Sequence, residues 1–165
     1  MDLPKRKPTR LKGYDYSTPG AYFITICTKD RKELLSKIIV GDDAYLVPKN
    51  HISNYGAICD KYINNINIKY KNVTVDKYVI MPNHIHLIIF LHRTMKASSP
   101  TKNIETIIRS FKTMVTKEIG YSIWQRSYHD HIIRGEKDYK KISEYIDTNV
   151  IRWEKDCFYN SETEQ

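Results

Sequence analysis

The stretch His84-Ile-His-Leu-Ile-Ile-Phe-Leu91 decides the fold, because its residues alternate between two kinds of side chain. Successive side chains of a β-strand point to opposite faces, so every second residue shares a face. One face is wholly aliphatic and is expected to face the core: Ile85, Leu87, Ile89 and Leu91. The other face begins with His84 and His86 and continues with Ile88 and Phe90. We therefore expect a strand that holds two histidines side by side.

The segment before this strand supports a β-hairpin. Val73, Val75 and Val79 alternate with polar residues, and Met81-Pro-Asn83 then makes a tight connection to the histidine strand. Further upstream, apolar residues from Asn50 to about Tyr70 recur every three or four positions, which predicts an amphipathic helix.

Two more strands are expected near the N-terminus. The β-branched and aromatic stretch Ala21–Thr28 reads as a strand. A short strand is also expected at Ala44–Val47, where Pro48 ends it.

The C-terminal half continues the alternation of helices and strands. A helix is predicted from Ile104 to Ile119 and ends at Gly120. A strand follows at Tyr128–Arg134, and a last helix is expected from about Asp138 to Trp153, with Ile142, Ile146, Val150 and Trp153 as its buried stripe. This order predicts a ferredoxin-like α+β fold, in which an antiparallel sheet has helices packed on one face, plus an appended C-terminal helix.

Length and charge limit the classes of protein. The 165 residues suit one domain, which we expect at residues 21–160 behind a basic extended arm at residues 1–20. The net charge of +8 points to a polyanionic partner, with nucleic acid as the first candidate.

The cysteines and the apolar runs indicate a compartment. The chain has three cysteines at wide spacings and no C-x-x-C pair, so a reduced, cytoplasmic protein is expected. The longest apolar run, Leu87–Leu91, is too short to cross a membrane, and the N-terminus has no signal-peptide pattern. We expect no membrane partner.

The histidine pair is a candidate metal site. Residues two apart on one strand face are about 6–7 Å apart, so the two rings can converge on one divalent ion. The alternative is that His84 and His86 are ordinary histidines at the rim of a hairpin.

A tyrosine and an amide form a second constellation, on the last helix. Tyr145 and Asn149 lie one turn apart at the border of the buried stripe. A phenol with a pKa of about 10 is a poor nucleophile at neutral pH, but a divalent ion on a phosphate would activate the phosphorus. An amide oxygen beside two imidazoles suits Mg²⁺ or Mn²⁺. The alternative is that Tyr145 only packs and Asn149 is a surface amide.

These residues together resemble those of a known family. His84-Ile-His86, followed about sixty residues later by Tyr145 and an amide four positions on, is similar to the HUH single-tyrosine (Y1) transposases of the IS200/IS605 type. Other stretches resemble the REP-associated tyrosine transposases within that group: Tyr22–Thr28 with Arg31, Val79–His86, Trp124–Arg126, Asp130–Arg134, and Tyr145–Asn149 with Trp153.

The resemblance implies a reaction and a role for each residue. Tyr145 would attack a phosphodiester of single-stranded, hairpin-bearing DNA and leave a 5′-phosphotyrosine and a free 3′-hydroxyl. His84, His86 and Asn149 would hold the Mg²⁺ or Mn²⁺ ion. One departure is Val150, where the family usually has proline, so we expect the last helix to continue further than in relatives.

Additional polar residues are candidates for supporting the site or contacting DNA. Four of them lie in the segment before the last helix: Arg126, Asp130, His131 and Arg134. The basic arm is expected to follow the phosphate backbone through Lys5, Arg6, Lys7, Arg10 and Lys12.

Two other classes of protein compete with this interpretation. A non-catalytic module that binds single-stranded nucleic acid can use the same sandwich, but it would present aromatic residues on an open sheet face. A metal-independent two-histidine phosphoesterase would need two separated His-x-Thr/Ser motifs, and none is present. The sequence leaves three questions open: which DNA is the target, whether the protein is the enzyme of a mobile element or a domesticated copy, and whether it is a monomer or a homodimer.

Overall fold

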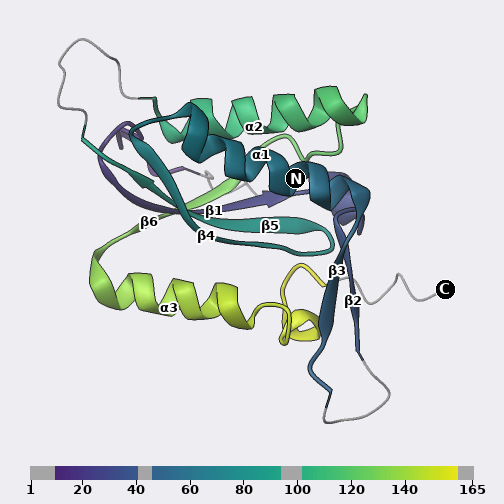
Figure 1. Ribbon diagram of the computed structural model, residues 1–165. Coiled ribbons are helices and arrows are strands. Elements are labelled where there is room, and N and C mark those ends of the chain that lie inside the picture. The colour runs from purple at the N-terminus through teal and green to yellow at the C-terminus, as the bar shows by residue number, and fades with distance from the viewer. Residues whose placement is uncertain (1–9, 41–45, 94–101, 160–165) are drawn as a thin grey trace, which may run out of the picture.

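The computed structural model describes residues 10–40, 46–93 and 102–159. A four-stranded antiparallel sheet forms its centre, in the order β4-β5-β1-β6. The strands are β1 (Gly20–Cys27), β4 (Val73–Ile80), β5 (His84–Leu91) and β6 (His129–Ile133). Helices α1 (Asn54–Lys69) and α2 (Ile104–Ile119) cover one face, and α3 (Gly135–Thr148) lies on the other (Figure 1). The ferredoxin-like α+β fold that the sequence predicts is confirmed.

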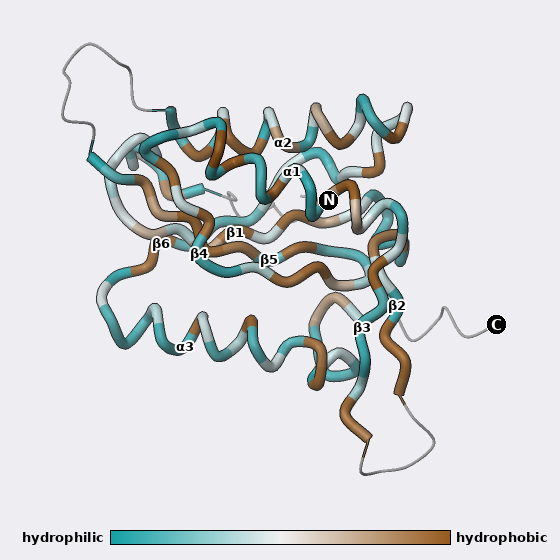
Figure 2. The backbone as a smooth tube through the Cα atoms, in the orientation of Figure 1, coloured by the Kyte–Doolittle hydropathy of each residue, from teal (hydrophilic) through white to brown (hydrophobic). Residues whose placement is uncertain are grey.

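The sheet separates two cores of different size. The larger core lies between the sheet and helices α1 and α2, and it takes up Ile85, Leu87, Ile89 and Leu91 of β5. The smaller core lies under α3 and consists of Ile88, Ile133, Ile142 and Ile146. Figure 2 shows that the sheet is rich in hydrophobic residues while α3 is largely hydrophilic. The alternation in β5 therefore assigns its two faces as predicted.

Side-chain caps set the beginning of the first two helices. The hydroxyl of Ser53 accepts a hydrogen bond from the backbone N–H of Gly56 at 3.1 Å, and Asn103 caps α2 through the N–H of Thr106 at 2.8 Å. Gly120 ends α2 in the left-handed conformation, with φ of 94°, which glycine adopts without strain. The predicted end of α2 is confirmed.

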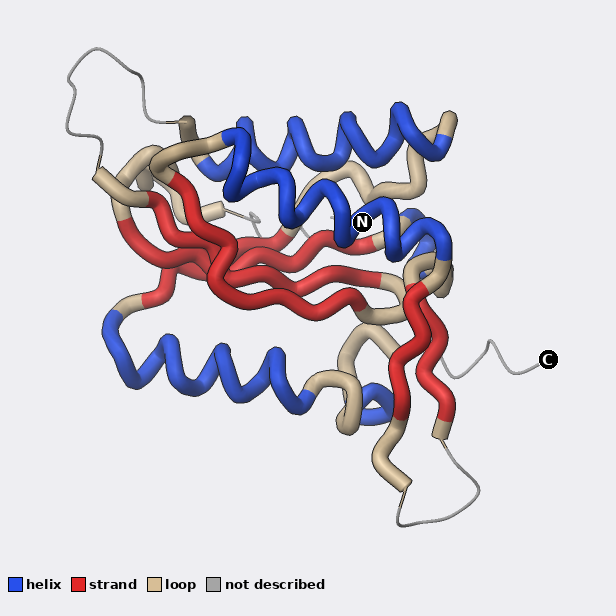
Figure 3. The backbone as a smooth tube through the Cα atoms, in the orientation of Figure 1, coloured by secondary structure: helices blue, strands red, loops and turns tan. Residues whose placement is uncertain are grey.

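A two-stranded ribbon replaces the start of the first predicted helix. Strands β2 (Ser36–Ile39) and β3 (Lys49–Ile52) pair with each other and project from one end of the main sheet (Figure 3). Helix α1 accordingly begins at Asn54 and not at Asn50. A short strand was expected at Ala44–Val47. This prediction is wrong for Leu46 and Val47, which do not belong to a strand. Its first two residues, Ala44 and Tyr45, lie outside the described residues. Each ribbon strand has only four residues, too few to show a period.

The last helix ends earlier than predicted. Helix α3 stops at Thr148, and the chain turns through Asn149 into a short 3₁₀ turn, η2 (Trp153–Lys155). The predicted continuation of the helix to Trp153 is therefore wrong, although position 150 carries no proline. A continued helix would carry Trp153 about 7.5 Å beyond Thr148 along the helix axis, whereas the turn buries its indole 5.9 Å from the ring of His84.

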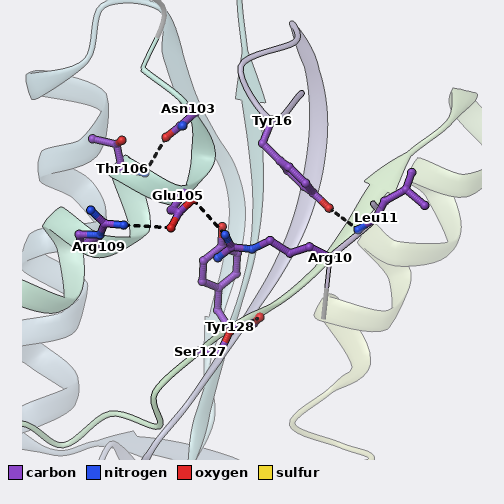
Figure 4. A network of polar contacts seen from close by, with 9 residues as sticks. All are labelled: Arg10, Leu11, Tyr16, Asn103, Glu105, Thr106, Arg109, Ser127 and Tyr128. Atoms are coloured by element: carbon purple, nitrogen blue, oxygen red, sulfur yellow. Dashed lines mark hydrogen bonds and ion pairs between the residues drawn. The ribbon is translucent and has the colours of Figure 1, made fainter. Parts of the chain in front are cut away.

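Residues 10–19 lie against the core. Tyr14 and Tyr16 pack on it, and the guanidinium of Arg10 stands 4.6 Å from the ring centre of Tyr128 and forms an ion pair with Glu105 at 3.0 Å (Figure 4). This half of the expected arm is therefore packed and does not extend from the domain. Lys5, Arg6 and Lys7 lie outside the described residues, and Lys12 is exposed.

In the part of the chain that the structure describes, none of the helices is both long enough and apolar enough to cross a membrane.

Replacement of Gly56 by alanine tests the contact between α1 and the ribbon. A Cβ at Gly56 would overlap the carbonyl oxygen of Leu35, which is held by a hydrogen bond from the N–H of Ser53 at 2.9 Å. We expect Gly56→Ala to lower the free energy of unfolding by about 1–3 kcal/mol, measured by chemical denaturation. Ala57→Gly on the exposed side is the control and costs about 1 kcal/mol through helix propensity alone. A stabilised Gly56→Ala protein would contradict the contact.

Candidate functional site

The two histidines lie together on the α3 side of the sheet. His84 and His86 are 0% and 1% exposed, and their ring centres are 4.4 Å apart. The register places Cys27 opposite His84 and Thr25 opposite His86 on β1. Both imidazoles are therefore on the face opposite Ile85 and Leu87, as the alternation predicts.

Hydrogen bonds at Nδ1 orient both rings. Nδ1 of His84 donates to the amide oxygen of Asn83, with 2.8 Å between the atoms. Nδ1 of His86 and the hydroxyl of Thr25 are also 2.8 Å apart. Since Asn83 Oδ1 is an acceptor, neutral His84 carries its proton on Nδ1 and leaves a lone pair on Nε2.

Tyr145 lies over this pair, on α3. Its hydroxyl oxygen is 3.4 Å from Nε2 of His86 and donates a hydrogen bond to Oδ2 of Asp156 at 3.1 Å. The amide nitrogen of Asn149 donates to the same carboxylate oxygen at 2.8 Å. Asp156 therefore joins the tyrosine to the amide one helical turn away.

Asp156 was not among the residues that the sequence analysis selected. It follows the turn at Trp153, and its other oxygen accepts a hydrogen bond from the N–H of Phe158 at 2.9 Å. No motif spacing marks it. Only the return of the chain after α3 brings this carboxylate to the histidines.

Four side chains here fit a divalent ion. One ligand atom each from His84, His86 and Asp156 lie within 4.8 Å of one another. Nε2 of His84 and Oδ1 of Asn149 are buried and have no hydrogen-bond partner among the described residues. An unpaired imidazole nitrogen and an unpaired amide oxygen are the atoms that a metal would engage, and this mixed N/O donor set suits Mg²⁺ or Mn²⁺.

Burial keeps the imidazoles neutral. It lowers the pKa of His84 to about 4, although the Asp156 carboxylate acts in the opposite direction. Burial, and then the neighbouring His84, hold the pKa of His86 well below its usual value. Both rings are therefore uncharged at neutral pH, which is the form that ligates a metal.

The phenol of Tyr145 is also protonated at neutral pH. Burial raises its pKa well above 10, and the adjacent Asp156 carboxylate raises it further. The phenolate is disfavoured because it would lie beside another negative charge. A positive charge close to the phenol would offset this rise in the pKa.

Aromatic rings enclose these polar groups. Phe23 lies edge-on to Tyr145 and 5.1 Å from the ring of His86, between ring centres. Phe158 lies 4.5 Å from the ring of His84, and its carbonyl accepts a hydrogen bond from Asn83 at 2.8 Å. The rings cover the imidazoles, while Tyr145 and Asp156 remain partly exposed.

The structure places the remaining candidates away from the histidines. Asp130 pairs with Ile24, a residue of the larger core, and so lies on the opposite side of the sheet. His131 contacts Asp138 at 2.9 Å, and the backbone N–H of Arg134 donates to the same carboxylate at 3.0 Å. These residues help to start α3.

Arg126 lies in the segment between α2 and β6. It lines a hollow beside Trp124, at the end of the sheet where His84 begins β5.

The fold and this site define a class of protein: a ferredoxin-like sheet that presents two histidines to a tyrosine carried by a helix, the arrangement expected of a Y1 transposase. Residues 18–149 match the family model described as "Transposase IS200 like". The chain belongs to this family of transposases.

The chain is also similar to two relatives and to one solved structure. An uncharacterized protein of Haemophilus influenzae is 38% identical, and the match covers 93% of this chain and 93% of that protein. A "Putative REP-associated tyrosine transposase" of the same organism is 26% identical over 84% of this chain and 74% of its own. The structure of a REP-associated tyrosine transposase bound to a REP hairpin superposes with a TM-score of 0.60 at 19% identity, over 87% of this chain and 74% of that one. This likeness shows the same fold.

Neutralising Asp156 tests its contact with the phenol. We expect Asp156→Asn to lower the pKa of Tyr145 while leaving it above 10, because burial remains. The pKa is measured from the tyrosine ¹³Cζ shifts in chelator-treated protein, with the signal of Tyr145 assigned by its loss in Tyr145→Phe. Asp147→Asn, on the same helix and ion-paired with Lys77, is the control and should not move this pKa. An unchanged pKa in Asp156→Asn would show that the carboxylate does not face the phenol.

Proposed function

We propose that this transposase is a metal-dependent endonuclease and strand transferase that nicks and rejoins single-stranded, hairpin-bearing DNA through a 5′-phosphotyrosine intermediate. The observation that carries the proposal is the position of the Tyr145 hydroxyl, 3.4 Å from His86 and hydrogen-bonded to Asp156. The proposed nucleophile, a proton acceptor and the proposed metal ligands thus lie within reach of one another.

Tyr145 is the proposed catalytic residue. Its oxygen forms a bond to phosphorus, the bond from phosphorus to the 3′-oxygen breaks, and that oxygen leaves as a 3′-hydroxyl after it takes a proton from water. The phenolic proton passes to Asp156, which already accepts its hydrogen bond. The covalent bond conserves the energy of the phosphodiester, so a 3′-hydroxyl can attack it to rejoin the strand without ATP.

His84, His86 and Asn149 are the proposed ligands of the ion, and Asp156 lies beside them. A Mg²⁺ or Mn²⁺ ion bound there would polarise the scissile phosphate and offset the negative charge that raises the pKa of Tyr145. The hydrogen bonds of Asn83 and Thr25 aim the imidazoles, which lets the ligands keep their positions during the reaction.

Two observations support DNA as the partner: the positive charge of the chain and its similarity to a solved structure. The net charge of +8 favours a polyanion, and the solved structure of the same fold is that of a REP-associated transposase bound to a REP hairpin. The competing binding module would need an open sheet face. Here α3 covers the face that carries the histidines, which favours the enzyme.

Removal of the phenolic oxygen of Tyr145 is the first test of this function. The wild-type protein, incubated with Mn²⁺ and hairpin oligonucleotides taken from the DNA that flanks the gene, should form a protein–DNA adduct that survives denaturation. Tyr145→Phe should abolish the adduct and leave the affinity for DNA nearly unchanged, because the ring and its packing remain. Tyr139→Phe, on the same helix with its hydroxyl on Asp76, is the matched control and should retain the adduct.

Two results would contradict this assignment. An adduct formed by Tyr145→Phe would place the nucleophile on another tyrosine. DNA binding by the wild-type protein with no adduct on any flanking hairpin would favour the binding module.

Loss of a metal ligand is the second test. We expect His84→Ala and Asn149→Ala each to weaken Mn²⁺ binding at least about tenfold in calorimetric titrations, since each removes a buried donor atom. His51→Ala, an exposed histidine on β3, should bind Mn²⁺ as the wild-type protein does. If both ligand variants bind Mn²⁺ normally, the ion does not lie between these side chains.

A further inference from the structure

Strand β4 contains a β-bulge that changes the face on which its side chains lie. Val75 pairs with Ile89 of β5, and both residues belong to the larger core under α1 and α2. The register then shifts between Val75 and Lys77, so that Lys77 pairs with Ile88. Because a bulge adds one residue to one strand only, the alternation of faces in β4 is reversed beyond it.

The reversal places Lys77 on the side of the sheet that α3 covers. Ile88, the partner of Lys77, is part of the smaller core under α3, and Val79 packs against the same core. Tyr78 lies on the opposite side, where its hydroxyl donates to Asp60 of α1 at 2.6 Å. Without the extra residue, the two-residue period of a strand would direct Lys77 into the larger core.

Lys77 connects β4 to the helix that carries the tyrosine. Its ammonium group donates to the hydroxyl of Ser143 at 2.8 Å and to a carboxylate oxygen of Asp147 at 2.7 Å. Both partners lie on α3, one before and one after Tyr145. Successive residues of an α-helix are about 100° apart around its axis, so Tyr145 projects about 180° away from this pair. We call Lys77, Ser143 and Asp147 together the Lys77 clamp.

The apolar contact of α3 with the sheet is narrow. The buried residues of this helix are Ile142 and Ile146, and the rest of it is largely hydrophilic (Figure 2). Side chains four positions apart lie one above the other, so these two form a single row along the helix. A single row holds the helix against the sheet but resists its rotation weakly. A polar contact at the side of the helix is therefore needed to fix that rotation.

We propose that Lys77 is a positioning residue, which sets the rotation of α3 and thereby the position of the Tyr145 hydroxyl over the metal ligands. The proposal rests on the function proposed above and adds the residue that holds its nucleophile in place. The hydroxyl is 3.4 Å from Nε2 of His86. Misplacement of a reacting group by about 1 Å can lower a rate about a hundredfold. The bulge serves this role because it directs Lys77 toward the helix.

The clamp differs from a contact that only stabilises the fold. The side chain of Asp147 is 59% exposed and that of Lys77 is 28% exposed. An ion pair this open to solvent contributes little to the free energy of unfolding. Loss of the clamp should therefore leave the protein folded while the tyrosine changes position.

The first test measures the rate of adduct formation by Lys77→Met at saturating Mn²⁺ and hairpin DNA from the gene's flanks. We expect the rate to fall at least about tenfold, while the Kd for DNA, the Kd for Mn²⁺ and the denaturation midpoint stay near those of the wild-type protein. Lys77→Arg keeps donors for both partners and should restore most of the rate. Lys69→Met is the matched control, since Nζ of Lys69 donates to the hydroxyl of Ser110 at 2.9 Å between α1 and α2, on the other side of the sheet.

Removal of the partners tests whether Lys77 acts through α3. Ser143→Ala with Asp147→Ala should slow adduct formation as much as Lys77→Met does, and alanine keeps the helical propensity of α3. All three substitutions together should slow the reaction no further, because they remove one and the same interaction. Losses that add up would show that Lys77 acts elsewhere and would overturn the clamp.

The position of the tyrosine is also measured without the reaction. The ring centre of Tyr145 lies 6.2 Å from that of Phe23 and 5.2 Å from that of His86. In chelator-treated protein, the nuclear Overhauser effects between these rings should weaken in Lys77→Met and return in Lys77→Arg. Effects of wild-type intensity in Lys77→Met would show that the clamp does not position the tyrosine.

Three outcomes of the rate measurement would overturn the clamp: a wild-type rate in Lys77→Met, an equal loss of rate in Lys69→Met, or a loss that weaker DNA binding or unfolding accounts for. The wild-type protein separates this proposal from the function it rests on. An adduct that forms at the same rate without Lys77 would keep the nuclease and reject the clamp. If the wild-type protein forms no adduct, the nuclease is rejected and the nuclear Overhauser effects alone decide on the clamp.

Discussion

The antiparallel pairing of β5 with β1 is the interaction on which the rest of the structure depends. It sets Cys27 opposite His84 and Thr25 opposite His86, so that His86 has its Nδ1 partner, the hydroxyl of Thr25, in place. A shift of register by one residue would exchange the two faces of the strand and move the imidazoles into the aliphatic core. The covering of both faces by helices makes such a shift costly, because Ile85 and Leu87 would leave the larger core.

Burial and charge act against each other in the site. The closed aromatic surroundings keep His84 and His86 neutral and Tyr145 protonated, while Asp156 adds a negative charge that none of these three groups balances. An environment of this kind favours a bound cation, since neutral imidazoles and a partly buried carboxylate are the groups that a divalent ion engages. The same electrostatics disfavour the phenolate of Tyr145, which ties the proposed chemistry to the proposed metal.

Much of the fold follows from local patterns. Period-two alternation placed the β4–β5 hairpin and both faces of β5, and helical spacing placed α2 with its end at Gly120. The patterns failed where contacts distant in sequence decide the outcome. The ribbon strands β2 and β3 are too short for a period, and α3 ends at Thr148 because the turn that follows buries Trp153 near His84.

The sequence by itself determined that two histidines share a strand face and that Tyr145 and Asn149 share a helix face, because both relations depend only on the geometry of one element. Only the tertiary structure decided that these faces meet, and that Asp156 lies between them, since that requires α3 to pack across β5 and the chain to return after it.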